Sequence, residues 1–241
     1  MDGIDLYVLI FVVIAISLAY LVDDLAFLSK GFGGLYGINA LAANLSSSIF
    51  LFNRAAMSLI LPALGFLVDS GISIKTMLLA IIGSAFLMCL LKVIMYLKIT
   101  RVILFLSWVA KKIYGAKRVS SQELDFIGVA YKGRVELKPT LAMVLFVAGM
   151  TIPSVMAIYF FDNRAFFIQL GFVFNMAGSL LTILFIERKV ALDAEKLVSG
   201  KLSQDSFIAS ISSIILSRAV GVFVYALIAA GALVLMTQGV Q

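Results

Sequence analysis

Six long apolar runs constrain this chain more than any other feature of its sequence. Each is long enough to cross a bilayer, whose hydrocarbon core needs about 20 helical residues. Inside a membrane the backbone hydrogen bonds must be satisfied within the protein, so such runs fold as helices. The sequence therefore predicts an all-α, polytopic membrane bundle of six transmembrane helices. The predicted spans are 6–27, 41–68, 75–97, 140–161, 165–186 and 206–235.

The composition supports a single membrane domain. Hydrophobic residues make up 63% of the 241 residues and charged residues make up 13%. In soluble proteins about 45–50% of the residues are hydrophobic and about 25% are charged. Because little of the chain lies outside the spans, we expect one integral domain over residues 1–241. The least hydrophobic section, 98–138, predicts an interfacial amphipathic helix around 99–115 followed by a cytosolic loop. The glycine-rich segment 29–39 is predicted to form a flexible loop or re-entrant turn. The segment 187–201 is predicted to be a charged link between spans five and six.

Basic residues are distributed unequally between the links. Most lie between spans three and four or between spans five and six, and only Lys75 and Arg164 lie on the opposite side. The positive-inside rule then puts the basic links in the cytosol and both termini outside. The basic residues of the two links are Lys98, Arg101, Lys111, Lys112, Lys117, Arg118, Lys132, Arg134, Lys138, Arg188, Lys189, Lys196 and Lys201.

Several function classes are disfavoured by missing residues. The chain has no histidine and one cysteine, Cys89, so histidine-based metal sites, histidine bases and intrachain disulfides are excluded. No nucleotide-binding, zinc-protease or nucleophile-elbow motif is present. We expect a transporter with no catalytic residue, metal or cofactor, rather than an enzyme. The excess of 19 basic over 13 acidic residues fits membrane lipids better than nucleic acid.

Two arginines lie deep inside predicted spans. Arg54 is at the middle of 41–68, where an arginine costs between about 3 and more than 10 kcal/mol. Arg218 lies 12 residues into the last span, at about the same depth as Arg54, because both spans start from the cytosol. We expect Arg54 to face the bundle interior and to form with Arg218 a clamp for a phosphate or pyrophosphate.

Polar and acidic residues near these arginines complete the candidate site. Those expected to line the path are Asn44, Ser47, Ser58, Asn175, Ser179 and Thr182. The acids Asp23, Asp24 and Glu187 would balance the charge of the clamp or carry a coupling proton. Alternatively, Asp23 or Asp24 pairs with Arg54, and Glu187 with Arg218, only to hold the bundle together. Lys92 reads as an interfacial anchor that snorkels.

Short motifs follow one another over most of the chain outside 99–138. The early motifs are Asp23 or Asp24, Asn53-Arg54-Ala55, Pro62-Ala63-Leu64-Gly65 and Val68-Asp69. The later motifs are Asn163-Arg164, Gln169-Leu170, Asn175 with Gly178, Asp193, Gly200-Lys201, and Ser217-Arg218 with Gly221. In their order and spacing these motifs resemble those of the Amj family of bacterial lipid II flippases. The sequence departs from the family at Glu187-Arg188, where Asp-Pro is expected, and in the glycine-rich segment from Lys30 to Gly37.

The resemblance implies a flippase of the bacterial cytoplasmic (inner) membrane. Its cargo would be lipid II, the undecaprenyl-pyrophosphate-linked precursor of peptidoglycan, and its role would lie in cell wall biogenesis and cell shape. Arg54 and Arg218 would hold the pyrophosphate. Three alternatives remain open: a flippase for another polyprenyl-pyrophosphate-linked oligosaccharide, a transporter of a small organic anion, and a membrane enzyme acting on polyprenyl phosphates. The sequence also leaves open a homo-oligomer.

Overall fold

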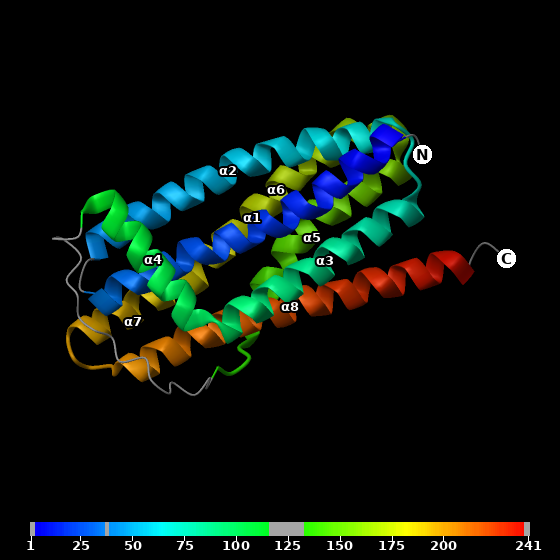
Figure 1. Ribbon diagram of the computed structural model, residues 1–241. Coiled ribbons are helices and arrows are strands. Elements are labelled where there is room, and N and C mark those ends of the chain that lie inside the picture. Colours follow the sequence, from blue (N-terminus) through cyan, green and yellow to red (C-terminus); the bar gives the residue numbers. More distant parts are fainter. Residues whose placement is uncertain (1–2, 37–38, 116–132, 239–241) are drawn as a thin grey trace.

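A computed structural model describes residues 3–36, 39–115 and 133–238, and within them the fold is all-α (Figure 1). Six of the helices are long and apolar enough to cross a membrane, as predicted, so this is a multi-pass membrane protein. The helical segments are α1 (Gly3–Tyr36), α2 (Asn39–Asp69), α3 (Ile74–Leu97), α4 (Ile99–Tyr114), α5 (Leu137–Tyr159), η2 (Phe161–Asn163), α6 (Arg164–Thr182), η3 (Ile183–Glu187), α7 (Arg188–Val198) and α8 (Gln204–Gln238).

The long helices pack mainly as neighbouring pairs. α1 lies against α2, α5 against α6, and α3 against α8, while α8 also packs on α5 and α1 on α3 and α7. In Figure 1 the N-terminal end of α1 and the C-terminal end of α8 lie at one end of the bundle, and α4 and α7 lie toward the other. After the predicted topology, we call these the outer end and the inner end. One contact at the centre is edge-to-face, between the rings of Tyr20 and Phe146, whose centroids are 5.1 Å apart.

The predicted loop at 29–39 is wrong, because α1 continues to Tyr36. Gly31 serves close packing within α1 rather than a turn. A methyl group added at Gly31 would lie 2.5 Å from Ile211 Cδ1 of α8. Leu28 and Leu35 are also buried, so the apolar face of α1 extends through the glycines. Residues 37 and 38 lie outside the described part of the chain.

The predicted link at 187–201 is also mostly helical. The π-helix η3 joins α6 directly to α7, which ends at Val198. The amphipathic α7 buries Val190 and Ala194. The helix ends shortly before Gly200, whose φ of 71° is a conformation that favours glycine. The fifth span therefore continues into a charged helix at the inner end.

The section 98–138 is helical where the sequence predicts it to be. The predicted helix at 99–115 is confirmed as α4, which buries Ile103, Leu106 and Ala110 on one face and exposes Trp108. Residues 116–132 lie outside the described part.

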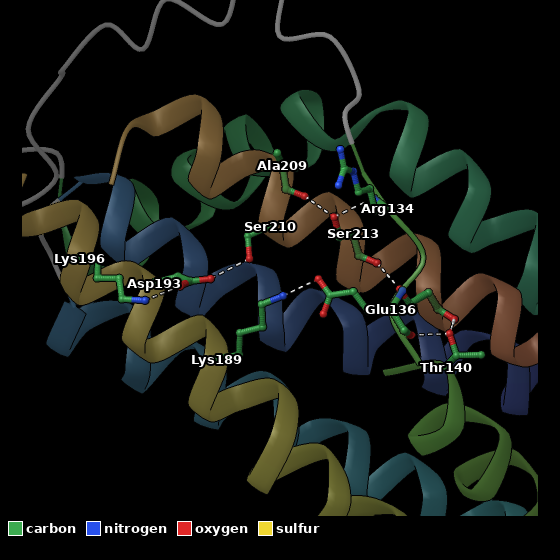
Figure 2. Close-up of polar contacts among 10 residues, drawn as sticks. Arg134, Glu136, Thr140, Lys189, Asp193, Lys196, Ala209, Ser210 and Ser213 are labelled. Carbon is green, nitrogen blue, oxygen red and sulfur yellow. Dashed lines mark hydrogen bonds and ion pairs between the residues drawn. The ribbon is translucent and has the colours of Figure 1, made fainter. Parts of the chain in front are cut away.

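The residues just before α5 lie along α8. The Arg134 amide donates to Ser213 Oγ at 2.9 Å (Figure 2). The Glu136 amide donates to Ser217 Oγ at 2.7 Å.

Close contact between α5 and α8 depends on Gly221. A methyl group there would lie 2.5 Å from the Thr140 carbonyl oxygen. We expect Gly221→Ala to lower the free energy of unfolding by about 1–3 kcal/mol, because backbone must move to accommodate it.

Gly83→Ala is the matched control for this substitution, since nothing lies within 4 Å of a methyl group at Gly83. It should be neutral or slightly stabilising, because alanine favours helix more than glycine does. Denaturant titration in micelles, followed by circular dichroism, measures both variants. Equal stability of the two variants would contradict close packing at Gly221.

Candidate functional site

Four charged side chains form a cluster at the centre of the bundle, which we call the buried charge cluster. Asp23 and Asp24 come from α1, Lys92 from α3 and Arg218 from α8. Each has 2% or less of its surface exposed. The cluster thus joins three helices through charges that are almost completely shielded from solvent.

The ion pairs within the cluster are direct. Arg218 Nη2 donates to Asp23 Oδ2 at 2.6 Å, and Arg218 Nε lies 2.7 Å from Asp24 Oδ1. Lys92 Nζ donates to Asp24 Oδ2. The guanidinium also lies over the ring of Phe27, with Arg218 Cζ 4.8 Å from its centroid. Arg218 Nη1 has no hydrogen-bond partner among the described residues.

Charge balance makes the cluster depend on every member. Two carboxylates face two cations, so the buried group is neutral as a whole. Removing one partner from a buried ion pair leaves an uncompensated charge and typically costs about 3–5 kcal/mol. The cluster therefore opposes any rearrangement that separates α8 from α1.

These contacts correct three predictions. Asp23 and Asp24 pair with Arg218 and Lys92 rather than with Arg54. Glu187 pairs with Lys30 rather than with Arg218. Lys92 is not an interfacial anchor, because only 1% of its surface is exposed and α4 begins almost directly after α3.

The prediction that Arg54 faces the bundle interior is also wrong. Its side chain is exposed on α2 and lies over the ring of Phe50, with Cζ 4.8 Å from the centroid. Arg54 forms no ion pair with any residue in the described part of the chain. Since Arg218 is enclosed within its cluster, the structure does not bring the two arginines together as a clamp.

A cavity of about 480 Å³ opens on the outside of the bundle toward its inner end. We call it the lateral cavity. Ala43 of α2 lies on one side, η3 and α7 lie on the other, and Lys30 comes from α1. Ala43, Ile183, Arg188 and Ala191 are exposed, so the cavity is accessible from the surface. Its lining is Lys30, Ala43, Ile183, Glu187, Arg188, Ala191 and Ala194.

Arg54 lies on the face of α2 that leads away from this cavity. The residues on this face recur at spacings of four or seven, which is the repeat of one helix side: Ala43, Ser47, Arg54, Ser58 and Gly65. Ala43 lines the lateral cavity. At the other end, a methyl group at Gly65 would lie 3.7 Å from Ile168 Cδ1 of α6. This face of α2 is therefore turned toward α6 and α7.

We call Ser47, Arg54 and Ser58 the Arg54 face. All three are exposed, so α6 does not cover them. On α6, Ser179 is half-buried and follows Ile168 by three helical turns, one turn before Ile183 of the cavity. The two helices thus meet near the outer end and present polar residues between that contact and the lateral cavity.

The remaining predicted residues lie elsewhere. Asn44 is exposed on the adjacent side of α2, and its carbonyl accepts a hydrogen bond from Ser48 Oγ. Thr182 is buried, with 6% of its surface exposed, and does not line the lateral cavity. The side chain of Asn175 lies outside the described part of the structure. Glu187 does line the cavity, although its partner is Lys30.

Sequence reasoning missed the roles of Lys30, Lys92 and Arg188. The signal for Lys30 was that the apolar pattern of α1 continues beyond it to Leu35. The signal for Lys92 was the lack of a helix-breaking glycine or proline between α3 and α4. Because helix continues almost without interruption past Lys92, this residue does not lie at a helix end. Arg188 could not be found from spacing, because the π-helix before it changes the helical register.

Comparison with models of protein families, with curated proteins and with solved structures found no match to this chain. Within the described residues, no group of three or more His, Cys, Asp or Glu side chains could hold a metal ion. The chemistry of the site therefore has to be argued from its own cations, carboxylates and cavities.

The pairing in the buried charge cluster leads to a stability test. We expect Lys92→Met to lower the free energy of unfolding by about 3–5 kcal/mol, because Asp24 then carries an uncompensated charge. The double variant Asp24→Asn with Lys92→Met restores neutrality and should recover most of that loss. Denaturant titration in micelles measures all variants.

Lys75→Met, at an exposed position in α3, is the control and should be near neutral. If the double variant is as unstable as the sum of its two single changes, the two residues do not form the pair described.

Proposed function

We propose that the protein is a flippase that moves a lipid with a phosphate or pyrophosphate head group between the leaflets of a membrane. The observation that carries the proposal is the position of Arg54. It is an exposed arginine near the middle of a membrane-spanning helix, with no carboxylate partner in the described part of the chain. Such a charge requires an anion from outside the bundle, because its burial in lipid alone is costly.

The lateral cavity supplies an entry for such a lipid. It has an apolar part, formed by Ala43, Ile183 and Ala191, next to the charged residues Lys30, Glu187 and Arg188. This polarity suits an amphiphile whose head group contacts the cations while its tail stays in the bilayer. The Arg54 face then supplies polar contacts along α2, and its guanidinium can bind a phosphate through two parallel hydrogen bonds.

Lipid cargo is favoured over a small soluble anion because the cavity opens on the side of the bundle. A transporter of small anions would need an enclosed pocket, whereas Ala43 and Ile183 are exposed to the surroundings. Within the lipid class we propose lipid II, on the resemblance of the motifs to those of the Amj family. The proposed location is the bacterial cytoplasmic membrane, with the inner end in the cytosol.

In this proposal Arg218 has a positioning role. Its guanidinium is already engaged by Asp23 and Asp24, so it holds α8 and α1 together while the cargo passes on the outside. The cargo then moves between α2 and the α6–α7 segment. These contact each other toward the outer end, where Gly65 lies near Ile168. Separation of Gly65 from Ile168 would open the path to the outer leaflet.

Transport of labelled lipid II in proteoliposomes tests the role of Arg54. We expect Arg54→Gln to reduce the rate by about 10-fold or more, since it removes a charge-assisted bond to the head group. The variant should fold as the wild type does, because the side chain is exposed and unpaired in the described part of the chain.

Lys75→Gln, another exposed cation, is the matched control and should transport normally. Full transport by Arg54→Gln would overturn the proposed role of Arg54. Transport of an undecaprenyl-pyrophosphate oligosaccharide instead of lipid II would keep the mechanism and change the cargo.

The orientation can be tested independently with single cysteines in a Cys89→Ser background. Ser73 lies between α2 and α3 at the outer end, and Ser199 follows α7 at the inner end. In intact cells a membrane-impermeant maleimide should label Ser73→Cys and leave Ser199→Cys unlabelled until the cells are broken. The reverse pattern would invert the proposed topology.

A further inference from the structure

A second cavity lies on the other side of the π-helix from the lateral cavity. It has a volume of about 580 Å³ and lies among η3, α7, α8 and the start of α5. Leu184, Phe185 and Ile186 of the π-helix line this cavity, whereas Ile183 and Glu187 line the lateral cavity. We call it the α5–α7 cavity. Its volume is in the range of ordinary ligand sites, about 300–1,000 Å³.

The charged residues that line this cavity are mostly cations. Four basic side chains and two carboxylates contribute: Lys138, Arg188, Lys189, Lys196, Glu136 and Asp193. Figure 2 shows that both acids are already occupied. Lys189 Nζ donates to Glu136 Oε1 at 2.5 Å, and Asp193 accepts from Ser210 Oγ at 2.7 Å and lies 3.6 Å from Lys196.

Two cations remain without a carboxylate among the described residues. Lys138 Nζ lies over the ring of Phe185, 5.5 Å from its centroid, and Arg188 is exposed. Lys138 is also the second residue of α5, at the positive end of the helix dipole, where a cation is unfavourable and an anion is stabilised. No side chain caps this helix start at Glu136. An anion in the cavity would satisfy both the lysine and the helix terminus.

The cavity also has a polarity that matches an amphiphile. Its apolar lining includes Leu184 and Phe185 at the end of the fifth span, while Lys189 and Lys196 follow on the helical extension beyond it. We propose that the α5–α7 cavity binds the phosphate group of an anionic membrane lipid, at a site separate from the path along Arg54. The same chemistry would accept a free phosphate, so the test has to separate these two sources.

The test uses two double variants that each remove two cations from the inner end. In Lys138→Gln with Lys196→Gln both residues line the cavity, whereas in Arg101→Gln with Lys112→Gln both lie on α4 outside it. Native mass spectrometry of the detergent-purified protein measures binding of phosphatidylglycerol and of phosphatidylcholine. We expect a preference for phosphatidylglycerol that falls about 30-fold in the first variant and stays unchanged in the second.

Inorganic phosphate distinguishes the source of the anion. If phosphate in the low millimolar range binds the delipidated protein and the cavity variant abolishes this binding, the ligand is a free phosphate. If only phosphatidylglycerol binds, it is the lipid. The proposal is overturned if neither probe binds, if the cavity variant binds as the wild type does, or if both double variants lose binding equally. Arg54 does not line the α5–α7 cavity, so Arg54→Gln should keep the part of this binding that the cavity variant loses. Failure of the flippase proposal, on which this site does not depend, and failure of this one are therefore distinguishable.

Discussion

The buried charge cluster is the interaction on which the rest of the structure depends. Two carboxylates of α1 are held between Lys92 of α3 and Arg218 of α8, at positions with almost no exposed surface. Unpaired charges at such positions would each cost several kcal/mol, so α1, α3 and α8 must stay together. Close contacts at Gly31 and Gly221 bring α8 near enough to α1 and α5 to complete this core.

This core explains why transport is proposed at the side of the molecule rather than through its centre. Among the described residues, the buried charge cluster and the packed pair Tyr20–Phe146 fill the interior with side chains that have little exposed surface. The helix α2, by contrast, packs mainly on α1 and exposes Arg54, Ser47 and Ser58 toward α6 and α7. A lipid that keeps its tail in the bilayer needs only such a lateral path for its head group.

The π-helix η3 gives the inner end its two cavities. It lies between them, and Arg188, the residue directly after it, lines both. A π-helix widens the turn and shifts the register of the following helix, which here turns Lys189 and Lys196 toward the start of α5. The amphipathic α7 can thus present cations on one side while burying Val190 and Ala194 on the other.

The sequence by itself determined the class of the protein and most of its helices. Apolar runs of this length must be helical in a membrane, and α2, α3, α4 and α8 were predicted within a few residues of their observed ends. Depth along a helix also follows from counting residues, so Arg54 and Arg218 were both recognised as deep. Only the tertiary structure decided to which side each arginine points and with which carboxylate, if any, it pairs. Arg218 meets Asp23 and Asp24, and Lys92 completes the group, whereas Arg54 stays outside. The physical reason is that spacing along one helix fixes a face, but pairing depends on which other helix packs against that face.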